Sequence, residues 1–565
     1  MAERPNLPIG LSDFRRIRED GKLYVDKTAW IGELVRDPAL VLVFPRPRRF
    51  GKTTNLSMLR YFFSRSAEDL SGLFEGLAVW GDEAARAHFQ RYPVIYLTLK
   101  DAKAGSFAEC IVEMRSLLAE LYARHRELLD GGRLPPDEAA RFTAILERRA
   151  DEGDMVRSLR ALSRALSEHH GQRVWILIDE YDTPLHEAFV HGYFDQAVTF
   201  FRKLLSGALK DNEYLHKGVL TGILRVAKES IFSDLNNLLV YSLLQPRYAP
   251  YFGFTADEVE ALARRANYAG SLDELREWYD GYRFGETVII YNPWSVLSAL
   301  NEGTCATYWV NTSSNALIGE LLLRASGDQY EELEALLRGG TIRKRISETT
   351  VLRGLYVDPE ALWSFLVFSG YLRASGARQE EDGSNTAELA IPNRELRIMF
   401  SGLFSEWLTA GLGGQRQVDE LGRALLAGDA GACEHAFNRL LVESASTLDT
   451  GTSSRVPPEQ VYHALTLGLL LYLQPRWLVR SNRESGYGRS DVLIIPREPG
   501  RPGCVLELKV RRKGQTIARA VAEGLAQIAT RDYAAELRGH GAAPIHALVA
   551  VFDGKRAVVR AAEPS

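Results

Sequence analysis

Four short, wholly apolar runs are the feature that most limits how this chain can fold. They lie at residues 40–44, 94–99, 174–178 and 218–223. Helical stretches such as residues 107–126 and 141–168 separate them. Strands that alternate with helices and have no polar face are typical of a parallel sheet covered on both sides. The pattern therefore predicts an α/β domain with a mainly parallel sheet and helices on both faces.

The rest of the 565 residues divides into two further predicted regions. Residues 251–402 have a mostly helical pattern, which we interpret as a helical lid and connector, called the connector below. A second α/β pattern then begins, with strands expected at residues 491–495, 504–510 and 546–552. We therefore expect three domains, at residues 1–250, 251–402 and 403–565.

Composition and charge exclude several classes of protein. With 46% hydrophobic and 25% charged residues and a net charge of −4, the chain is neither disordered nor uniformly basic. Its four cysteines lack C-x-x-C spacing, which argues against a zinc site and fits a reducing compartment. The N-terminus has no signal-like apolar stretch, and the most apolar run, residues 464–473, is too short to span a bilayer. We expect a cytoplasmic protein with no membrane partner.

A phosphate-binding motif follows the first apolar run. Gly51, Lys52 and Thr53 stand between a predicted strand and a helix, where backbone N–H groups, a lysine and a hydroxyl can receive phosphates and Mg²⁺. Thr54 continues the predicted nucleotide-binding segment. The match to G-x-x-x-x-G-K-[ST] is partial, because Arg46 occupies the place of the first glycine. The alternative is an ordinary helix start capped by a threonine.

An acidic pair strengthens the nucleotide interpretation. The apolar strand at residues 174–178 delivers Asp179 and Glu180 at its carboxyl end, where ligands bind in open parallel sheets. Asp179 is expected to hold Mg²⁺ together with Thr53, and Glu180 to polarise the attacking water. Taken alone, the acid pair is equally well explained as a solvated strand end. Together the two motifs predict a site for ATP and Mg²⁺.

Four other residues are weaker candidates for the same site. Thr221 and Arg225 follow the next apolar strand, where a polar group could sense the γ-phosphate, or where it simply ends a strand and caps a helix. Arg48 and Arg49 either contact phosphate or face solvent, and the sequence leaves both alternatives open.

A second constellation lies near the C-terminus. Metal-dependent phosphodiester hydrolysis needs carboxylates around Mg²⁺ and a lysine near the scissile phosphate. Alternation along a strand puts Glu507 and Lys509 on one face, and a hairpin would bring Asp491 beside them as a second metal ligand. Gln527, on a downstream helix, is expected to orient this site. An E-x-K on a solvated strand is the alternative, and further contributions from Glu459, Glu484 or Tyr533 stay open.

Several motifs together resemble a known bacterial family. They are Leu7-Pro8-Ile9-Gly10, Tyr24-Val25-Asp26-Lys27-Thr28, Arg46-Pro47-Arg48-Arg49-Phe50-Gly51-Lys52-Thr53, Asp179-Glu180-Tyr181-Asp182, Thr221-Gly222-Ile223, Lys228-Glu229-Ser230-Ile231-Phe232, Tyr291-Asn292-Pro293-Trp294-Ser295 and Tyr308-Trp309-Val310-Asn311-Thr312. The chain resembles the AAA-ATPase-like proteins that carry a C-terminal PD-(D/E)XK nuclease-like domain, which residues 486–491 and 507–509 also resemble.

The resemblance carries implications for fold and site. It implies a P-loop NTPase sheet, a restriction-endonuclease-like α/β domain, and a phosphate loop in which Arg46 is the family's own form. One departure is Leu224, where we expect a Thr before Arg225, and this weakens the sensing role predicted for Arg225.

Local charge indicates DNA as the partner of the C-terminal region. Residues 474–519 contain eleven Lys and Arg and four Asp and Glu, a local charge of about +7 in an acidic chain. Without a base-reading motif, binding is expected to tolerate any sequence. A solvated charged face is the alternative.

Two functions from different classes remain after these observations. The first is an ATPase coupled to a Mg²⁺-dependent DNA nuclease, and the second is a nucleotide-switched binding or regulatory module without cleavage. Both are compatible with a homo-oligomer, about which the sequence says nothing further.

Overall fold

The structure is a computed structural model whose described residues fall into two compact units. It describes residues 6–132, 134–224, 237–285, 287–309, 321, 327–337, 339–348, 352–356, 358–381, 384–411, 415–448, 473, 476–482, 491–512, 514–530, 537–553 and 556–562. The first unit comprises Met1–Leu317 and Gly339–Leu396, and the second Ile318–Arg338 and Arg397–Ser565. Most of the connector thus groups with the N-terminal region. The boundaries of the three predicted domains stay predictions.

A five-stranded parallel sheet forms the centre of the first unit. Its strands are β1 (Val41–Pro45), β2 (Val94–Thr98), β3 (Val174–Asp179), β4 (Leu215–Gly222) and β5 (Leu238–Val240). They lie in the order β2-β3-β4-β1-β5, and every neighbouring pair is parallel. All residues of β1 and β3 are buried, which explains why these runs carry no polar face. The predicted parallel sheet is confirmed.

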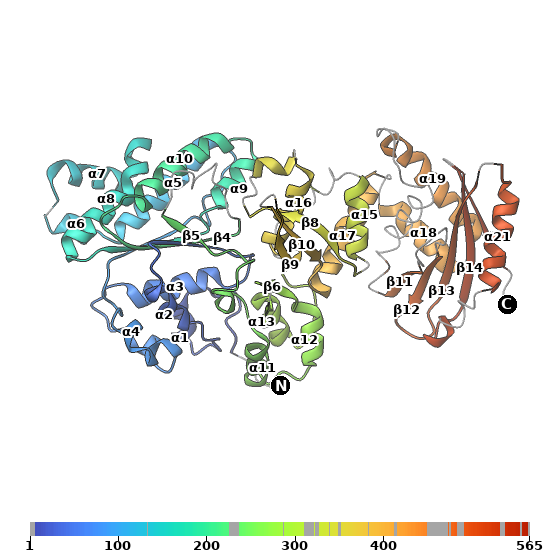
Figure 1. The fold of residues 1–565 in the computed structure, drawn as a ribbon, viewed down its shortest axis with the longest axis horizontal. Helices are drawn as coiled ribbons and strands as arrows, with labels where there is room; N and C mark the ends of the chain where they lie inside the picture. Colours follow the sequence, from blue (N-terminus) through green and yellow to red (C-terminus); the bar gives the residue numbers. More distant parts are fainter. Residues whose placement is uncertain are drawn as a thin grey trace. The chain divides into compact units, whose positions relative to one another are not determined.

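Helices cover both faces of this sheet (Figure 1). On one side lie α1 (Phe14–Glu19), α2 (Ala29–Arg36), α3 (Lys52–Phe63) and α4 (Glu83–Arg86), with the short 3₁₀ turns η1 (Ser71–Leu73) and η2 (Ala78–Gly81). On the other side lie α5 (Phe107–Ala123), α6 (Glu127–Asp130), α7 (Pro136–Leu146), α8 (Glu152–His170), α9 (Thr183–Val190) and α10 (Phe194–Leu209). Helix α3 is held by stacking of Phe63 on Trp175 of β3, with ring centroids 3.8 Å apart.

The long helix predicted at residues 141–168 is two helices. Arg148 has a φ of 59°, a left-handed conformation that an α-helix cannot contain. Asp151 then starts α8 as its N-cap, because its side chain accepts a hydrogen bond from the N–H of Asp154. The periodicity is correct on either side of the break, but it carries no signal for the local backbone reversal.

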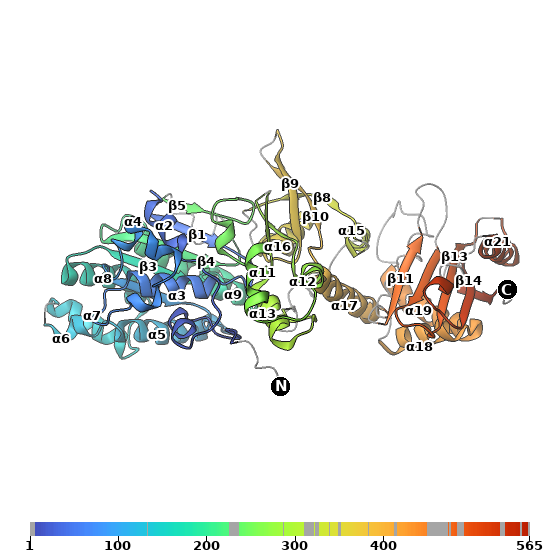
Figure 2. The same ribbon diagram turned by 90° about the horizontal axis from the view of Figure 1, so that it is seen from below.

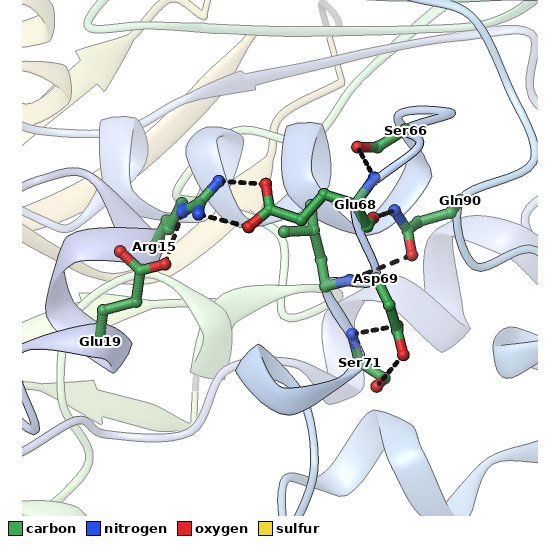
Figure 3. Close-up of polar contacts among 8 residues, drawn as sticks. Arg15, Glu19, Ser66, Glu68, Asp69, Ser71 and Gln90 are labelled. Carbon is green, nitrogen blue, oxygen red and sulfur yellow. Dashed lines mark hydrogen bonds and ion pairs between the residues drawn. The ribbon is translucent and has the colours of Figure 1, made fainter.

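Exposed polar contacts tie α1 to the segment that follows α3. Arg15 donates to both carboxylate oxygens of Glu68, at 2.8 and 2.6 Å, and to Glu19 at 2.6 Å (Figure 3). Gln90 makes two hydrogen bonds to the same segment: it donates to the Glu68 carbonyl at 2.7 Å and accepts from the N–H of Leu70. Because solvent screens such pairs, we interpret them as fixing the path of this segment rather than as a main source of stability.

The connector contains helices, as predicted, and also short strands. It includes η3 (Ala249–Tyr251) at its start, α11 (Ala256–Arg265), α12 (Leu272–Tyr279), β6 (Tyr282–Phe284), β7 (Val288–Ile290), α13 (Pro293–Glu302), β8 (Ile342–Ile346), η5 (Leu352–Tyr356), α16 (Pro359–Phe368), β9 (Arg373–Gln379) and β10 (Asn385–Ala390). The hairpin β6–β7 and the sheet β8-β10-β9 stand apart from the main sheet. Helix α17 (Arg394–Gly411) begins within this unit.

A buried carboxylate holds the start of α17 in place. Glu395 has no exposed surface and accepts hydrogen bonds from the Ser295 hydroxyl at 2.7 Å and from the N–H groups of Tyr308 and Trp309, each at 2.6 Å. Glu395→Ala is expected to destabilise the protein by about 3 kcal/mol, because it leaves several buried donors without an acceptor. Thermal unfolding checks this, with exposed Glu260→Ala as the control. Equal melting temperatures for the two variants would contradict the assignment.

The second unit is a mixed sheet between helices. Its strands are β11 (Trp477–Asn482), β12 (Asp491–Pro496), β13 (Gly503–Val510), β14 (Ile545–Asp553) and β15 (Arg556–Ala561), in that order. Only β13 and β14 pair in parallel. Its helices are α15 (Gly327–Leu337), the rest of α17, α18 (Gln415–Ala427), α19 (Ala430–Leu448) and α21 (Ile517–Thr530). Figure 2 shows α18 and α19 on one face of the sheet and α21 on the other. The predicted C-terminal α/β fold is confirmed.

Candidate nucleotide and nuclease sites

The segment between β1 and α3, residues 46–51, is called the phosphate loop here. Gly51 caps α3 with a φ of 80°, and Arg49 adopts a φ of 68°. A left-handed conformation is uncommon for a side chain such as that of Arg49, and such conformations persist mainly where surrounding structure enforces them. The loop is therefore held in one shape, with Gly51 at the position that requires a glycine.

Lys52 folds its side chain back over the phosphate loop. Its ammonium donates to the carbonyl oxygens of Arg46 at 3.0 Å and Pro47 at 2.9 Å, and the residue is 5% exposed. Burial lowers the pKa of Lys52, and the nearby carboxylates of Glu180 and Asp179 oppose that shift. An ammonium has three donors, so one is left for an anion once the two carbonyls are satisfied.

Asp179 stands at the centre of the predicted nucleotide site. It accepts hydrogen bonds from the hydroxyl groups of Thr53 at 2.7 Å and Thr221 at 2.6 Å, and it is fully buried. The sheet produces this arrangement, because Asp179 and Thr221 are register partners on β3 and β4 and α3 begins beside them. Burial raises the pKa of Asp179, and the two hydroxyl donors oppose that shift. Three of the candidate side chains are therefore in direct contact.

The turn after β3 carries two further acids. Glu180 has a φ of 52°, is partly exposed, and accepts a hydrogen bond from the Thr183 hydroxyl at 3.2 Å. Asp182 is 4% exposed and accepts from the N–H groups of Ile223 at 2.9 Å and Leu224 at 2.8 Å. The sequence indicates no role for Asp182 beyond its position three residues after Asp179. It ties the turn after β3 to the end of β4.

This tie requires a residue without a side chain at Gly222. A Cβ there would lie 2.5 Å from Asp182 Oδ1 and 2.7 Å from a ring carbon of Tyr181. Gly222→Ala is therefore expected to destabilise the protein by about 1–3 kcal/mol through overpacking. Denaturant unfolding checks this, with Gly72→Ala as the matched control, because a Cβ at Gly72 meets nothing within 4 Å. Equal stabilities would contradict the close packing.

The remaining candidate residues of the nucleotide site, where the structure describes them, make no side-chain hydrogen bond to Lys52, Thr53 or Asp179. Arg48 is partly buried, and the guanidinium of exposed Arg49 lies over the ring of Trp294, 4.3 Å from its centroid. Thr54 is partly buried in the first turn of α3. Arg225 lies outside the described residues. The roles of these residues stay predictions.

Residues of the connector contact the phosphate loop at two places, which the sequence pattern does not predict. The ring of Phe50 packs on Tyr282 and Phe284 of β6, with centroids 4.9 and 5.5 Å away. A Cβ at Gly370 would lie 2.6 Å from the side chain of Pro47, so backbone and loop are in close contact there. The aromatic-rich turns of the connector give a weak sequence signal for this contact, but nothing in their spacing identifies the partner.

In the second unit, the predicted hairpin brings the nuclease candidates together. β12 and β13 are antiparallel, with Asp491 and Glu507 as register partners. The side chain of Asp491 lies outside the described residues, so its position is known only from the backbone register. Glu459, Glu484 and Tyr533 also lie outside them.

Glu507, Lys509 and Gln527 form a connected series of contacts. The ammonium of Lys509 lies 2.7 Å from Glu507 Oε1 and donates to Gln527 Oε1 at 2.6 Å. Glu507 is fully buried, whereas the Lys509 side chain is 16% exposed. Helix α21 presents Gln527 because it packs tightly on β14 at Gly524, where a Cβ would lie 2.6 Å from Val549. The expected same-face geometry of Glu507 and Lys509 is therefore present, with Gln527 on their side of the sheet.

The metal-binding chemistry differs between the two sites. Over the ranges that the structure describes, no three His, Cys, Asp or Glu side chains gather closely enough to hold a metal ion. Mg²⁺ at a nucleotide site needs only one or two protein oxygens, since phosphates and water supply the rest, so Thr53 and Asp179 suffice there. At the C-terminal site, Glu507 is the one candidate ligand whose side chain is described.

Several arginines of the basic C-terminal segment have acidic partners. Arg511 lies 2.8 Å from Asp553, Arg519 lies 3.2 Å from Glu523, and Arg501 lies 3.3 Å from Glu498. Asp553 and Glu523 come from outside residues 474–519, so part of the predicted local charge is compensated.

No helix in the described part of the chain combines the length and apolar character needed to cross a membrane.

Comparison with known proteins agrees with this architecture. Residues 8–232 match the family model described as "Predicted AAA-ATPase", and residues 457–562 match that of the PD-(D/E)XK nuclease superfamily. A relative named "Uncharacterized protein in vnfD 5'region", from Azotobacter chroococcum mcd 1, is 27% identical over 437 residues, which cover 75% of each protein. The predicted resemblance is therefore confirmed: a region similar to AAA-ATPases is followed by one similar to PD-(D/E)XK nucleases.

Proposed function

We propose that this protein binds and hydrolyses ATP and that its second unit is a Mg²⁺-dependent DNA nuclease. The observation that carries the first half is the 2.7 Å hydrogen bond between Thr53 and Asp179. It links the start of α3 to the end of a buried strand, beside a lysine with a donor left for phosphate. This is the arrangement that P-loop NTPases use for a metal-bound triphosphate.

The residues present fit ATP and Mg²⁺. Asp179 and Thr53 offer hard oxygen ligands, which Mg²⁺ prefers, and the cation would neutralise charge on the phosphates. Lys52 would bind phosphate oxygens, Glu180 would orient and polarise a water molecule, and Thr221 would sense the γ-phosphate through its contact with Asp179. Arg48, Arg49 and Arg225 are proposed as further phosphate contacts.

The nuclease half rests on the contacts among Glu507, Lys509 and Gln527. Glu507 and Asp491 are proposed as metal ligands, and Lys509 as the cation nearest the scissile phosphate, with Gln527 holding its ammonium. The carboxylate chemistry fits Mg²⁺, which would supply Lewis-acid stabilisation of the phosphodiester. DNA is the proposed substrate, bound without sequence preference through basic side chains such as Arg476 and Arg512, which are exposed.

A nucleotide-switched binding module without cleavage is the second candidate. It is favoured by the ion pair between Lys509 and Glu507, because a carboxylate neutralised in this way could be purely structural. A reducing cytoplasm is the proposed location for either function, since all four cysteines are free thiols.

A paired nuclease assay tests the proposal. Wild-type protein, Lys52→Ala and Glu507→Ala are incubated with single- and double-stranded DNA and Mg²⁺, with and without ATP. The nuclease proposal expects cleavage by wild type and a strongly reduced cleavage rate for Glu507→Ala. Wild-type protein that binds ATP and DNA but cleaves neither substrate supports the binding module instead.

A further inference from the structure

Arg46 occupies the place where a phosphate loop ordinarily has its first glycine, and the structure gives each part of this residue a partner. Its N–H donates to the carbonyl of Gly222, at the end of β4, at 2.9 Å. Its carbonyl accepts from the ammonium of Lys52 at 3.0 Å. Its side chain is fully buried beneath the loop.

The guanidinium of Arg46 lies over two aromatic rings of the connector. The ring centroids of Phe252 and Phe284 are 5.1 and 5.2 Å from its central carbon, which is the range of cation–π contacts. Nη1 donates to the carbonyls of Tyr241 at 2.7 Å and Pro45 at 3.1 Å. In the part of the chain that the structure describes, Nε and Nη2 have no hydrogen-bond acceptor, and no carboxylate pairs with this cation.

Burying a charged group in such an environment costs desolvation free energy. Burial lowers the pKa of Arg46 to about 9, which still leaves it charged at neutral pH. An apolar side chain would fill the same space without the desolvation penalty of a buried cation. A role confined to packing therefore explains the shape of this side chain but not its charge.

We propose that Arg46 is a positioning residue of the nucleotide site, which fixes the carbonyl that orients Lys52. The side chain is clamped by Phe252 and Phe284, and the N–H is bonded to Gly222, so the residue has little freedom to rotate. Its carbonyl, one of the two that hold Lys52, is thereby directed at the ammonium. This inference rests on the proposed ATP site.

The clamp also connects the connector to the phosphate loop at two points. Phe284 packs on Arg46 at the beginning of the loop and, with centroids 5.5 Å apart, on Phe50 near its end. A displacement of β6 would therefore shift both ends of the loop and change the position of the Lys52 ammonium. Where a phosphate loop ordinarily has a flexible glycine, this fold has Arg46, whose side chain is held rigidly against the connector.

A double-mutant cycle tests the proposal. Mg²⁺–ATP affinity is measured by calorimetry for wild type, Arg46→Met, Lys52→Ala and the double variant. Arg46→Met keeps much of the apolar length and removes the charge and the donors. We expect it to weaken binding about 10-fold when Lys52 is present and less than about 2-fold when Lys52 is absent, because contacts that act through one another are not additive. Arg46→Lys is expected to retain part of the affinity.

A second buried cation provides the matched control. Lys27 is 6% exposed and donates to Glu258 and to the Pro250 carbonyl, and among the described residues none of its hydrogen bonds or ion pairs reaches the phosphate loop. Lys27→Met is expected to lower stability but leave ATP affinity unchanged. Equal effects of Arg46→Met with and without Lys52, or no effect at all, would overturn the positioning role. If Arg46→Met does not fold, the same cycle is run with Arg46→Lys.

The calorimetry results for these variants also distinguish a failure of this inference from a failure of the proposed function. If wild type and Lys52→Ala bind ATP equally, the nucleotide site itself is wrong, and the inference is overturned with it. If Lys52→Ala weakens binding and Arg46→Met does not, the ATP site stands and only the positioning role is lost.

Discussion

Glu507→Ala is expected to lower the rate of DNA cleavage about 10³-fold while leaving DNA affinity nearly unchanged. A metal-bound phosphodiester gains several kcal/mol of transition-state stabilisation, and about 1.4 kcal/mol corresponds to a factor of ten in rate. Glu507 is the buried carboxylate of the site, opposite Asp491 in the β12–β13 register. The basic side chains that would hold the DNA backbone remain in the variant. Single-turnover cleavage and fluorescence anisotropy measure the two quantities separately.

Two further variants make this result specific. Glu507→Gln keeps the shape of the side chain and is expected to lose cleavage as fully as the alanine variant, because the amide is a poor ligand for Mg²⁺. Glu498→Ala removes an acid whose side chain is 74% exposed and ion-paired with Arg501, and it is expected to cleave as wild type does. Cleavage by Glu507→Ala at the wild-type rate would remove Glu507 from the site and leave any activity to another centre.

The sheet of the first unit was predictable because its central strands are buried on both faces. β1 is apolar throughout and β3 is apolar up to Asp179, so their positions follow from composition alone, and each boundary lies within one residue of the prediction. The order of the strands was not predictable, since it depends on which runs pair. β5 is a three-residue edge strand with partly exposed side chains, and a run of this length carries no clear pattern.

The edge strand β15 of the second unit could not be predicted for a different reason. β15 is paired on one side by β14, and its other side is covered by α19. Asn438 of α19 both donates to the carbonyl and accepts from the N–H of Ala557, which lies 119 residues away in the sequence. A strand with one edge held by side chains of a distant helix shows no local periodicity that reveals it.

The candidate sites were predictable where chemistry depends on local spacing. Gly51-Lys52-Thr53 and the E-x-K on β13 could be placed on their elements because a strand end and a strand face are local properties. The environment of Arg46 could not, because Phe252 and Phe284 are more than 200 residues away in the sequence. Asp182 was missed for the same reason, since its partners are backbone N–H groups at the end of another strand.

Lys52→Ala is expected to weaken ATP binding roughly 10- to 100-fold and to abolish hydrolysis. Hydrogen bonds to charged groups contribute about 1.5–3 kcal/mol each, and about 1.4 kcal/mol is a factor of ten in Kd. The ammonium already sits on the carbonyls of Arg46 and Pro47, so little reorganisation is needed to bind phosphate. Calorimetry with Mg²⁺–ATP and a phosphate-release assay measure the two effects.

Folding and binding can be separated in this variant because of how Lys52 is buried. It is 5% exposed, and its hydrogen-bond partners among the described residues are carbonyls rather than carboxylates, so removing it leaves no uncompensated buried anion in direct contact. We therefore expect Lys52→Ala to fold and to lose ATP affinity, while Lys203→Ala, on the exposed surface of α10, changes neither folding nor affinity. Unchanged ATP affinity in Lys52→Ala would remove the nucleotide site, and with it any reason for Arg46 to be charged.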